Sequence, residues 1–414
     1  MKAKMNRRTF LKMGGGVGIA AATIGFPNFL RGAQPATVKI GGLWPLTGYL
    51  ATGGNTSMNG AKVAMEEINQ AGGIKALGGA KLEILKADTQ SKVDIGMAET
   101  ERTIGAGAHA LIGCWGTDIT LASTQVSSKY SIPHLVDSGV SPEITQRGFK
   151  HIFKLISTPE TCALAALRDL KRLSELTGVK PKTAIIFASD SMYGQNMAKS
   201  YQKHLSKVLD IIGNFRFPIG IKDFSVEMTK LKAMKPDLLF VQNYVPDAIL
   251  MTRQMKTQDF DCMAVWGMFD AARCVEEFIN GLGKLAEYQW NTIDNSDYKQ
   301  KRYWEASEKY KKVMGHDLPM NAALSYTLIY VLADALERAK SYNKEKLVEA
   351  LRKTYFKNHF LCGGAVAFGE DGQCLNDFNT TQQILNGRLQ NILPEKYQTA
   401  KAIFPAPKWS ERKD

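Results

Sequence analysis

The chain has 414 residues, 22% of them charged and 44% hydrophobic, which is the composition of an ordinary globular protein with the length of two domains. Its formal net charge of +13 comes from basic residues interspersed with acidic ones, a pattern that argues against the clustered basic stripe of a nucleic-acid-binding protein. The six cysteines include no CxxC pair and are too few for a disulfide scaffold. Pairing of Cys262 with Cys274 and of Cys362 with Cys374, or six buried free thiols, both remain open.

Short motifs of the common enzyme and metal-site classes are missing. The six histidines are dispersed, and no HExxH, GxSxG or GxxxxGK[ST] sequence occurs. The glycines at 14–18 lie near the N-terminus rather than after a strand, so they do not form a dinucleotide-binding loop. We therefore expect neither an enzyme nor a bound metal or cofactor.

The first 36 residues have the pattern of an export signal. Residues 6–12 read NRRTFLK, which resembles the twin-arginine (Tat) motif of proteins exported in folded form, and a glycine-rich apolar stretch follows at 14–26. As a helix this stretch spans about 20 Å, short of a bilayer core of roughly 30 Å, so cleavage near 33–36 is favoured over an uncleaved anchor or a chance arginine pair. The segment predicts a periplasmic protein.

From Thr37 onward, strand-like and helix-like segments alternate. Residues 38–43 are apolar and β-prone, and a helix predicted over 57–70 ends at the glycines of 71–73. Further elements are predicted in the order strand 82–88, helix 92–106, strand 108–113, helix 119–130 and strand 132–136.

The alternation starts again beyond residue 157. Apolar residues with a helical period fill 298–355, and residues 364–372 with the segment after them are predicted to form a hairpin. The elements between are predicted as strands at 183–189, 237–242 and 263–266 and helices at 194–209 and 246–257. Strands that alternate with helices in this way predict parallel sheets covered on both faces, and two such runs predict two doubly wound α/β lobes.

Several segments are similar to one known family. Residues 39–48 (KIGGLWPLTG), 59–69 (NGAKVAMEEIN) and 71–74 (AGGI) resemble the opening of the leucine/isoleucine/valine-binding protein family, the type I periplasmic solute-binding proteins of ABC importers. Matching blocks continue in order to about residue 385. The resemblance implies a three-crossing hinge about which the lobes close on a ligand. With crossings near 157, 290 and 360, the first lobe comprises 37–157 and 290–360, and the second comprises 158–289 and 361–414.

The resemblance also implies ligand contacts in the first lobe. Thr117 takes the place of a hydroxyl residue that binds the ligand's carboxylate, although it could instead only cap the following helix. Ser138 and Val140 match a second contact through a carbonyl and an amide. The family commonly has threonine at the place of Val140, so one hydroxyl is missing. Asp137 is either a partner for a ligand cation or a solvated loop residue.

From the second lobe, the resemblance implies contacts by two tyrosines and an acid. Tyr193 and Tyr244 follow successive strands and offer an aromatic face with a polar tip, with ordinary packing as the alternative for each. The family's acid, which holds a ligand ammonium, falls on Asp270 or on its neighbour Phe269. Asp270 in the cleft suits an amino acid, whereas Phe269 there suits an unaminated or aromatic acid.

Two further features concern the size of the predicted pocket. Gly53 stands where relatives often carry a bulky aromatic residue, which predicts a roomier pocket. Trp44, Trp115 and Trp266 could line that space or pack elsewhere.

Together these observations predict a substrate-binding component of an ABC transporter that captures a small amphipathic solute and presents it to a membrane permease. An aliphatic or branched-chain amino acid is the expected ligand, and an aromatic or other small carboxylate is the alternative. A sensory module that passes the ligand signal to a receptor would share the fold and differ in partner. We expect a monomer that binds no nucleic acid.

Overall fold

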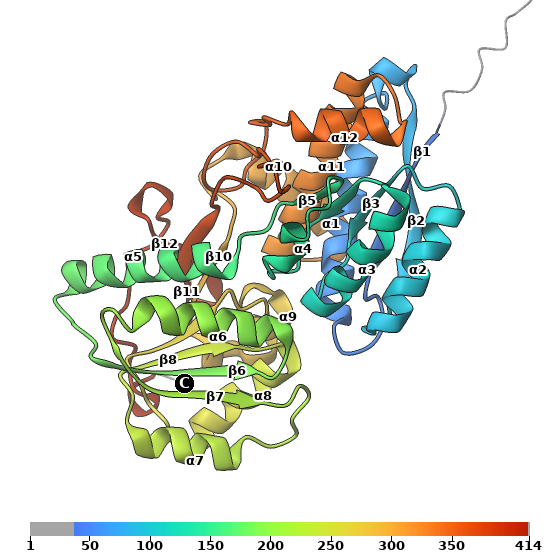
Figure 1. Ribbon diagram of the computed structural model, residues 1–414. Coiled ribbons are helices and arrows are strands. Elements are labelled where there is room, and N and C mark those ends of the chain that lie inside the picture. The colour runs from blue at the N-terminus through green and yellow to red at the C-terminus, as the bar shows by residue number, and fades with distance from the viewer. Residues whose placement is uncertain (1–36, 413–414) are drawn as a thin grey trace, which may run out of the picture. The chain divides into compact units, whose positions relative to one another are not determined.

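The structure, a computed structural model, describes residues 37–412, in which two sheets are each flanked by helices (Figure 1). The Tat signal and cleavage site predicted from the sequence lie outside these residues. The predicted α/β class with two doubly wound sheets is confirmed. None of the helices within 37–412 combines the length and apolar character needed to cross a membrane.

The first sheet has five strands, all parallel, in the order β2-β1-β3-β4-β5. Side chains along β1 alternate between its two faces, with Ile40 in the cluster formed with helices α1 and α11 and Leu43 in the cluster that contains Ile119 of helix α3. The strands are β1 (Thr37–Trp44), β2 (Lys81–Asp88), β3 (Ala110–Gly113), β4 (His134–Val136) and β5 (Ile152–Lys154).

Helices cover both faces of this sheet. On one face α1 and α11 approach closely because Gly60 has no side chain; a Cβ there would lie 2.2 Å from the backbone oxygen of Ala322. Helices α2 and α3 pack together on the opposite face, α10 packs against α1, and α12 packs against α11. Their bounds are α1 (Ala51–Gln70), α2 (Val93–Gly105), α3 (Thr117–Tyr130), α10 (Lys301–Met314), α11 (Met320–Ala339) and α12 (Lys344–Arg352), with the short α4 (Glu143–Gln146) beside β5.

The second sheet has seven strands in the order β12-β11-β10-β9-β8-β6-β7. The five strands from β6 to β10 run parallel, whereas β11 and β12 are antiparallel and are joined by the turn Asn386-Gly387, in which both residues have positive φ. The strands are β6 (Thr183–Ser189), β7 (Asp210–Phe217), β8 (Leu238–Gln242), β9 (Ala264–Met268), β10 (Trp290–Asp294), β11 (Asn379–Leu385) and β12 (Arg388–Leu393).

Helices also cover both faces of the second sheet. Ile186 and Phe240 point toward α5 and α6, and their neighbours Ile185 and Leu239 point toward α7 and α8. Helix α5 begins at a capping box in which Thr158 and Thr161 satisfy each other's backbone amides. The helices are α5 (Pro159–Thr177), α6 (Met192–Leu205), α7 (Ser225–Met234), α8 (Val245–Thr257) and α9 (Glu276–Leu282), which packs against α8.

The chain passes between the sheets three times, the first time between β5 and α5. The second crossing follows Asp294 rather than lying near 290, because residues 290–294 form β10 and pair with β9 and β11. The segment after residue 360 still belongs with the first sheet, since Lys154 of β5 pairs with Gln373 and its amide donates to the Gly372 carbonyl at 2.8 Å. The third crossing therefore lies between 374 and 379, later than the sequence predicted.

Several elements, including β5, β10, α5 and α7, were not predicted from the sequence, and other local predictions differ from the structure. Helix α1 begins at Ala51, six residues before the predicted start, and the edge strand β7 was not predicted. The hairpin predicted around 364–372 is reduced to isolated bridges, of which one joins Phe368 to Cys374, and the regular hairpin is β11–β12. All six cysteines are free thiols.

Candidate ligand-binding site

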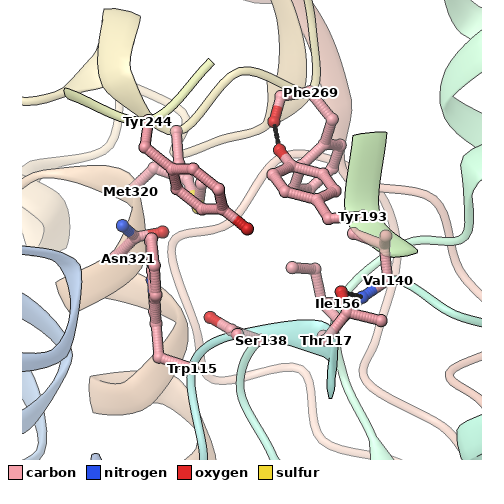
Figure 2. Close-up of a pocket in the computed structure, with 13 residues that line it drawn as sticks. Trp115, Thr117, Ser138, Val140, Ile156, Tyr193, Tyr244, Phe269, Met320 and Asn321 are labelled. Carbon is pink, nitrogen blue, oxygen red and sulfur yellow. Dashed lines mark hydrogen bonds between the residues drawn. The ribbon is translucent and has the colours of Figure 1, made fainter. Parts of the chain in front are cut away.

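A cavity lies among loops that follow strands of both sheets, and its empty space, including the part open to solvent, is about 350 Å³ (Figure 2). The first sheet contributes the loops after β3 and β4, and the second contributes residues that follow β6, β8 and β9. Parallel strands place their carboxyl ends at one edge of a sheet, which is where α/β proteins bind ligands. The lining residues are Trp115, Gly116, Thr117, Ser138, Gly139, Val140, Ile156, Tyr193, Tyr244, Phe269, Ala271, Met320 and Asn321.

The cavity brings together five of the six residues predicted from the sequence, namely Thr117, Ser138, Val140, Tyr193 and Tyr244. Thr117 is the first residue of α3, and its hydroxyl makes no capping bond; it accepts a hydrogen bond from the Val140 amide at 3.3 Å. Because the first backbone amides of a helix have no partner within it, this end of α3 can donate to an anion. The hydroxyl and the helix terminus together suit a carboxylate.

Buried Lys154 holds the loop after β4 in place by hydrogen bonds to its backbone. Its Nζ donates to the Val140 carbonyl at 3.0 Å and to the Ser141 carbonyl at 3.3 Å. Burial lowers the pKa of Lys154 to about 7, and the carboxylates of Asp294 and Asp371 oppose that shift. Lys154 does not line the cavity, so it acts on a ligand only by holding this loop in place.

Aromatic side chains form the opposite wall. Tyr193 lies in the first turn of α6, where the Ser191 hydroxyl caps the helix by accepting from the Gly194 amide at 3.0 Å. The ring of Tyr244 lies 6.1 Å from that of Tyr193 and 6.2 Å from that of Trp115. Burial raises the pKa of both tyrosines, so their hydroxyls remain protonated at neutral pH. This wall suits the hydrocarbon part of a ligand.

Asp270 does not line the cavity; its neighbour Phe269 does. The Asp270 carboxylate is fully buried and forms an ion pair of 2.5 Å with Arg273, and it also accepts from the backbone amides of Asn243 and Ala272. These partners direct it into the second sheet's own interior. The sequence left open whether Phe269 or Asp270 faces the cavity. In the structure the lining residue is Phe269.

The remaining candidates divide between the cavity wall and the core. Trp115 lines the cavity, whereas Trp266 stacks on Trp290 at 5.2 Å. Gly53 does not line it but lies against the Trp115 ring, where a Cβ would approach Cζ2 to 2.2 Å. Asp137 is not a solvated residue, because its side chain is fully buried and accepts from Trp44 Nε1 at 2.8 Å.

Sequence reasoning missed four lining residues, Ile156, Ala271, Met320 and Asn321. The latter two open helix α11, whose apolar period indicates a core helix and gives no sign that its first turn reaches a ligand site. Among residues 37–412, no Asp, Glu, Lys or Arg side chain lines the cavity. The same residues contain no group of three or more His, Cys, Asp or Glu arranged for a metal ion.

Comparison with known proteins agrees with this geometry. The family model described as periplasmic binding protein matches residues 37–387. The "Leu/Ile/Val-binding protein homolog 8" of Brucella suis biovar 1 (strain 1330) is 27% identical over 96% of this chain and 99% of its own length.

Two solved structures show the same fold. The branched-chain amino acid transporter substrate-binding protein LivJ of Streptococcus pneumoniae, in complex with isoleucine, is 21% identical with a TM-score of 0.74 and covers 89% of this chain and 100% of its own. A solute-binding protein of an ABC transporter from R. palustris, in complex with benzoate, is 14% identical with a TM-score of 0.74 and covers 86% and 96%. The chain thus belongs to the periplasmic binding protein family, a family of binding proteins and not of enzymes.

Proposed function

We propose that this protein captures a small amphipathic carboxylate, first of all an aliphatic or branched-chain amino acid, and delivers it as a monomer to the membrane permease of an ABC importer. The observation that carries this proposal is the pairing, within one cavity, of an anion-binding helix end from the first sheet with an aromatic wall from the second. A branched-chain ligand is supported by the Leu/Ile/Val-binding relative and by the isoleucine in the similar structure.

In this proposal the two sides of the cavity bind different parts of the ligand. The Thr117 hydroxyl and the free amides of the first turn of α3 donate to the carboxylate, with the loop of Ser138 and Val140 beside them. Tyr193, Tyr244 and Phe269 pack against the hydrocarbon part. The segment 6–12 is proposed to direct export through the Tat pathway, which carries folded cargo.

An aromatic or other unaminated carboxylate is the second candidate. The observation in its favour is that the Asp270 carboxylate is held by Arg273 and that the lining offers no acid for a ligand ammonium. The similar benzoate-bound structure shows that this fold accommodates such a ligand.

Thermal unfolding of the purified mature protein with single solutes tests the proposal. The panel contains leucine, isoleucine, valine, alanine, benzoate and 4-hydroxybenzoate. One class is expected to stabilise the protein by about 2.7 kcal/mol at a hundredfold excess over its dissociation constant. A flat response to every solute would contradict the proposal.

A variant links the response to the cavity. Thr117→Val keeps the side-chain volume and removes the hydroxyl, and it should reduce stabilisation by any carboxylate ligand by about 1 kcal/mol or more. Thr257→Val, the same change at the exposed end of α8, is the control and should leave the response unaltered.

A further inference from the structure

The side chain of Asn321 has an unused hydrogen-bonding capacity inside the cavity. It is 2% exposed and lines the cavity from the first turn of α11. Its Nδ2 is buried without a partner, and within residues 37–412 neither its side-chain nitrogen nor its side-chain oxygen forms a hydrogen bond; the Ser325 hydroxyl oxygen lies 3.2 Å from its backbone carbonyl. Figure 2 shows the amide beside Trp115, with its oxygen toward the open space and with Thr117 and Val140 on the other side.

The buried carboxyl group of Asp137 lies behind this part of the cavity. Asp137 directly precedes Ser138, which lines the cavity, and one carboxylate oxygen accepts from Trp44 Nε1 at 2.8 Å and from the Ser325 hydroxyl at 2.6 Å. The other oxygen is buried without a hydrogen-bond partner among residues 37–412. Burial raises the pKa of Asp137, while the bonds from Ser325 and Trp44 oppose that rise.

Helix α11 connects the two groups. Ser325 lies one turn after Asn321, and its hydroxyl lies within hydrogen-bond distance of both the Asp137 carboxylate and the Asn321 carbonyl. The Asn321 amide therefore faces the cavity from the same helical face that holds the Asp137 carboxylate. A cation placed against the Asn321 oxygen would have the Asp137 carboxyl group on the far side of Ser325, where the positive charge would favour its ionised form.

An ammonium group entering such a cavity loses water from three N–H donors and needs acceptors and a counter-charge in return. Asp270 cannot supply them, because Arg273 occupies it. We propose that the α-ammonium group of an amino-acid ligand is held by the side-chain oxygen of Asn321, with the carboxylate of Asp137 behind it as counter-charge. This inference rests on the amino-acid form of the proposed function and adds the residue that would distinguish an amino acid from its unaminated analogue.

Calorimetric titration with a matched ligand pair tests it. Leucine and 4-methylpentanoate share the carboxylate and the hydrocarbon and differ in the ammonium alone. The wild-type protein should bind leucine at least about tenfold more tightly, because hydrogen bonds to a charged group are worth roughly 10- to 100-fold in affinity. Asn321→Leu should remove this preference by weakening leucine, while 4-methylpentanoate changes by less than about threefold.

Further variants separate a lost acceptor from lost packing. Asn321→Asp restores an acceptor and should restore the preference for leucine, and Asp137→Asn should reduce it with Asn321 intact. Asn321→Ala repeats the test if the leucine variant does not fold. Asn280→Leu makes the same substitution at an exposed position of α9 and should change neither affinity.

The outcomes distinguish this inference from the proposed function. If wild type binds leucine and Asn321→Leu binds it equally well, or if both ligands weaken equally, Asn321 does not hold the ammonium and the proposed function stands. If another amino acid binds in place of leucine, the same comparison uses that amino acid and its own des-amino acid, such as valine and 3-methylbutanoate. If no amino acid binds and benzoate does, both the amino-acid ligand and this inference are overturned.

Discussion

The hydroxyl of Tyr193 donates a hydrogen bond to the backbone carbonyl of Phe269, and both residues line the same cavity. Phe269 has a φ of +55°, a region that bulky residues rarely adopt, and its amide is held by the Thr292 carbonyl at 3.0 Å. Tyr193 therefore has two roles: its ring forms part of the cavity wall, and its hydroxyl helps to keep Phe269 in an unfavourable backbone conformation.

Two substitutions at Tyr193 should separate these roles. Tyr193→Phe keeps the ring and leaves the Phe269 carbonyl without its donor, so we expect a loss of about 1 kcal/mol of stability and a small loss of affinity. Tyr193→Ala should weaken ligand binding by about tenfold or more while the protein remains folded. Urea unfolding and calorimetric titration measure the two effects. Tyr310→Phe is the control, because the buried Tyr310 hydroxyl has no hydrogen-bond partner to lose among residues 37–412. Unchanged ligand affinity in Tyr193→Ala would show that Tyr193 is not part of the ligand site.

Gly53 should limit the cavity indirectly, through Trp115. Since a Cβ at residue 53 would lie 2.2 Å from Trp115 Cζ2, Gly53→Ala should displace the indole and destabilise the protein by about 1–3 kcal/mol. Affinity for bulky ligands such as leucine or benzoate should fall more than affinity for alanine. Gly105→Ala, at the exposed end of α2 with no neighbour within 4 Å, should instead be neutral or stabilising by up to about 1 kcal/mol. Equal behaviour of the two variants would contradict this role of Gly53.

Asp270 should behave as a structural residue. Asp270→Asn leaves the buried Arg273 without its counter-charge, which we expect to cost about 3–5 kcal/mol of unfolding free energy. Ligand affinity, measured well below the midpoint of thermal unfolding, should stay within about threefold of wild type. Asp259→Asn at an exposed position is the control and should change stability by less than about 0.5 kcal/mol. A large loss of affinity with unchanged stability would return Asp270 to the ligand site.

Much of the fold could be predicted because its strands are buried on both faces. The apolar runs at 183–189 and 237–242 match β6 and β8 almost residue for residue, since a central parallel strand leaves a continuous hydrophobic stretch in the sequence. The edge strand β7 lacks this signal, because most of Asp210–Phe217 is only partly buried and Gly213 interrupts it. The early start of α1 was missed because Gly53 and Gly54 disfavour a helix locally, whereas close packing against Trp115 and Pro45 requires residues without side chains there.

The site was predictable where it follows directly from strand ends. Thr117, Ser138 and Tyr193 come within a few residues of a buried strand, so topology alone brings them to one edge. Whether Phe269 or Asp270 faces the cavity depends on the positive φ of Phe269 and on the ion pair of Asp270 with Arg273. No local sequence pattern reveals either feature. Asn321 reaches the cavity from a helix more than two hundred residues away in sequence from Thr117, and only the packing of α11 against α1 places it there.

The pH dependence of the unfolding free energy should show whether Lys154, which holds the loop after β4, is neutral in the folded protein. Its pKa is lowered to about 7 by burial, whereas an unfolded lysine titrates near 10.4. Between these values the unfolded state holds a proton that the folded state has released, so this group makes the unfolding free energy rise with pH, by at most about 1.4 kcal/mol per pH unit.

Lys154→Met removes the titrating group and the bonds to the Val140 and Ser141 carbonyls. We therefore expect the stability of wild type relative to this variant to increase from pH 7.5 to pH 9.5 in urea unfolding, and ligand affinity to fall because the loop beside Thr117 loses its support. Asp294, whose pKa burial raises to about 7, has largely finished titrating in this window, so it does not reverse the trend. Lys301→Met, at a side chain that is 90% exposed, is the control and should follow the wild-type pH profile. If the unfolding free energies of wild type and Lys154→Met change with pH in parallel, Lys154 keeps its proton and its charge in the folded protein.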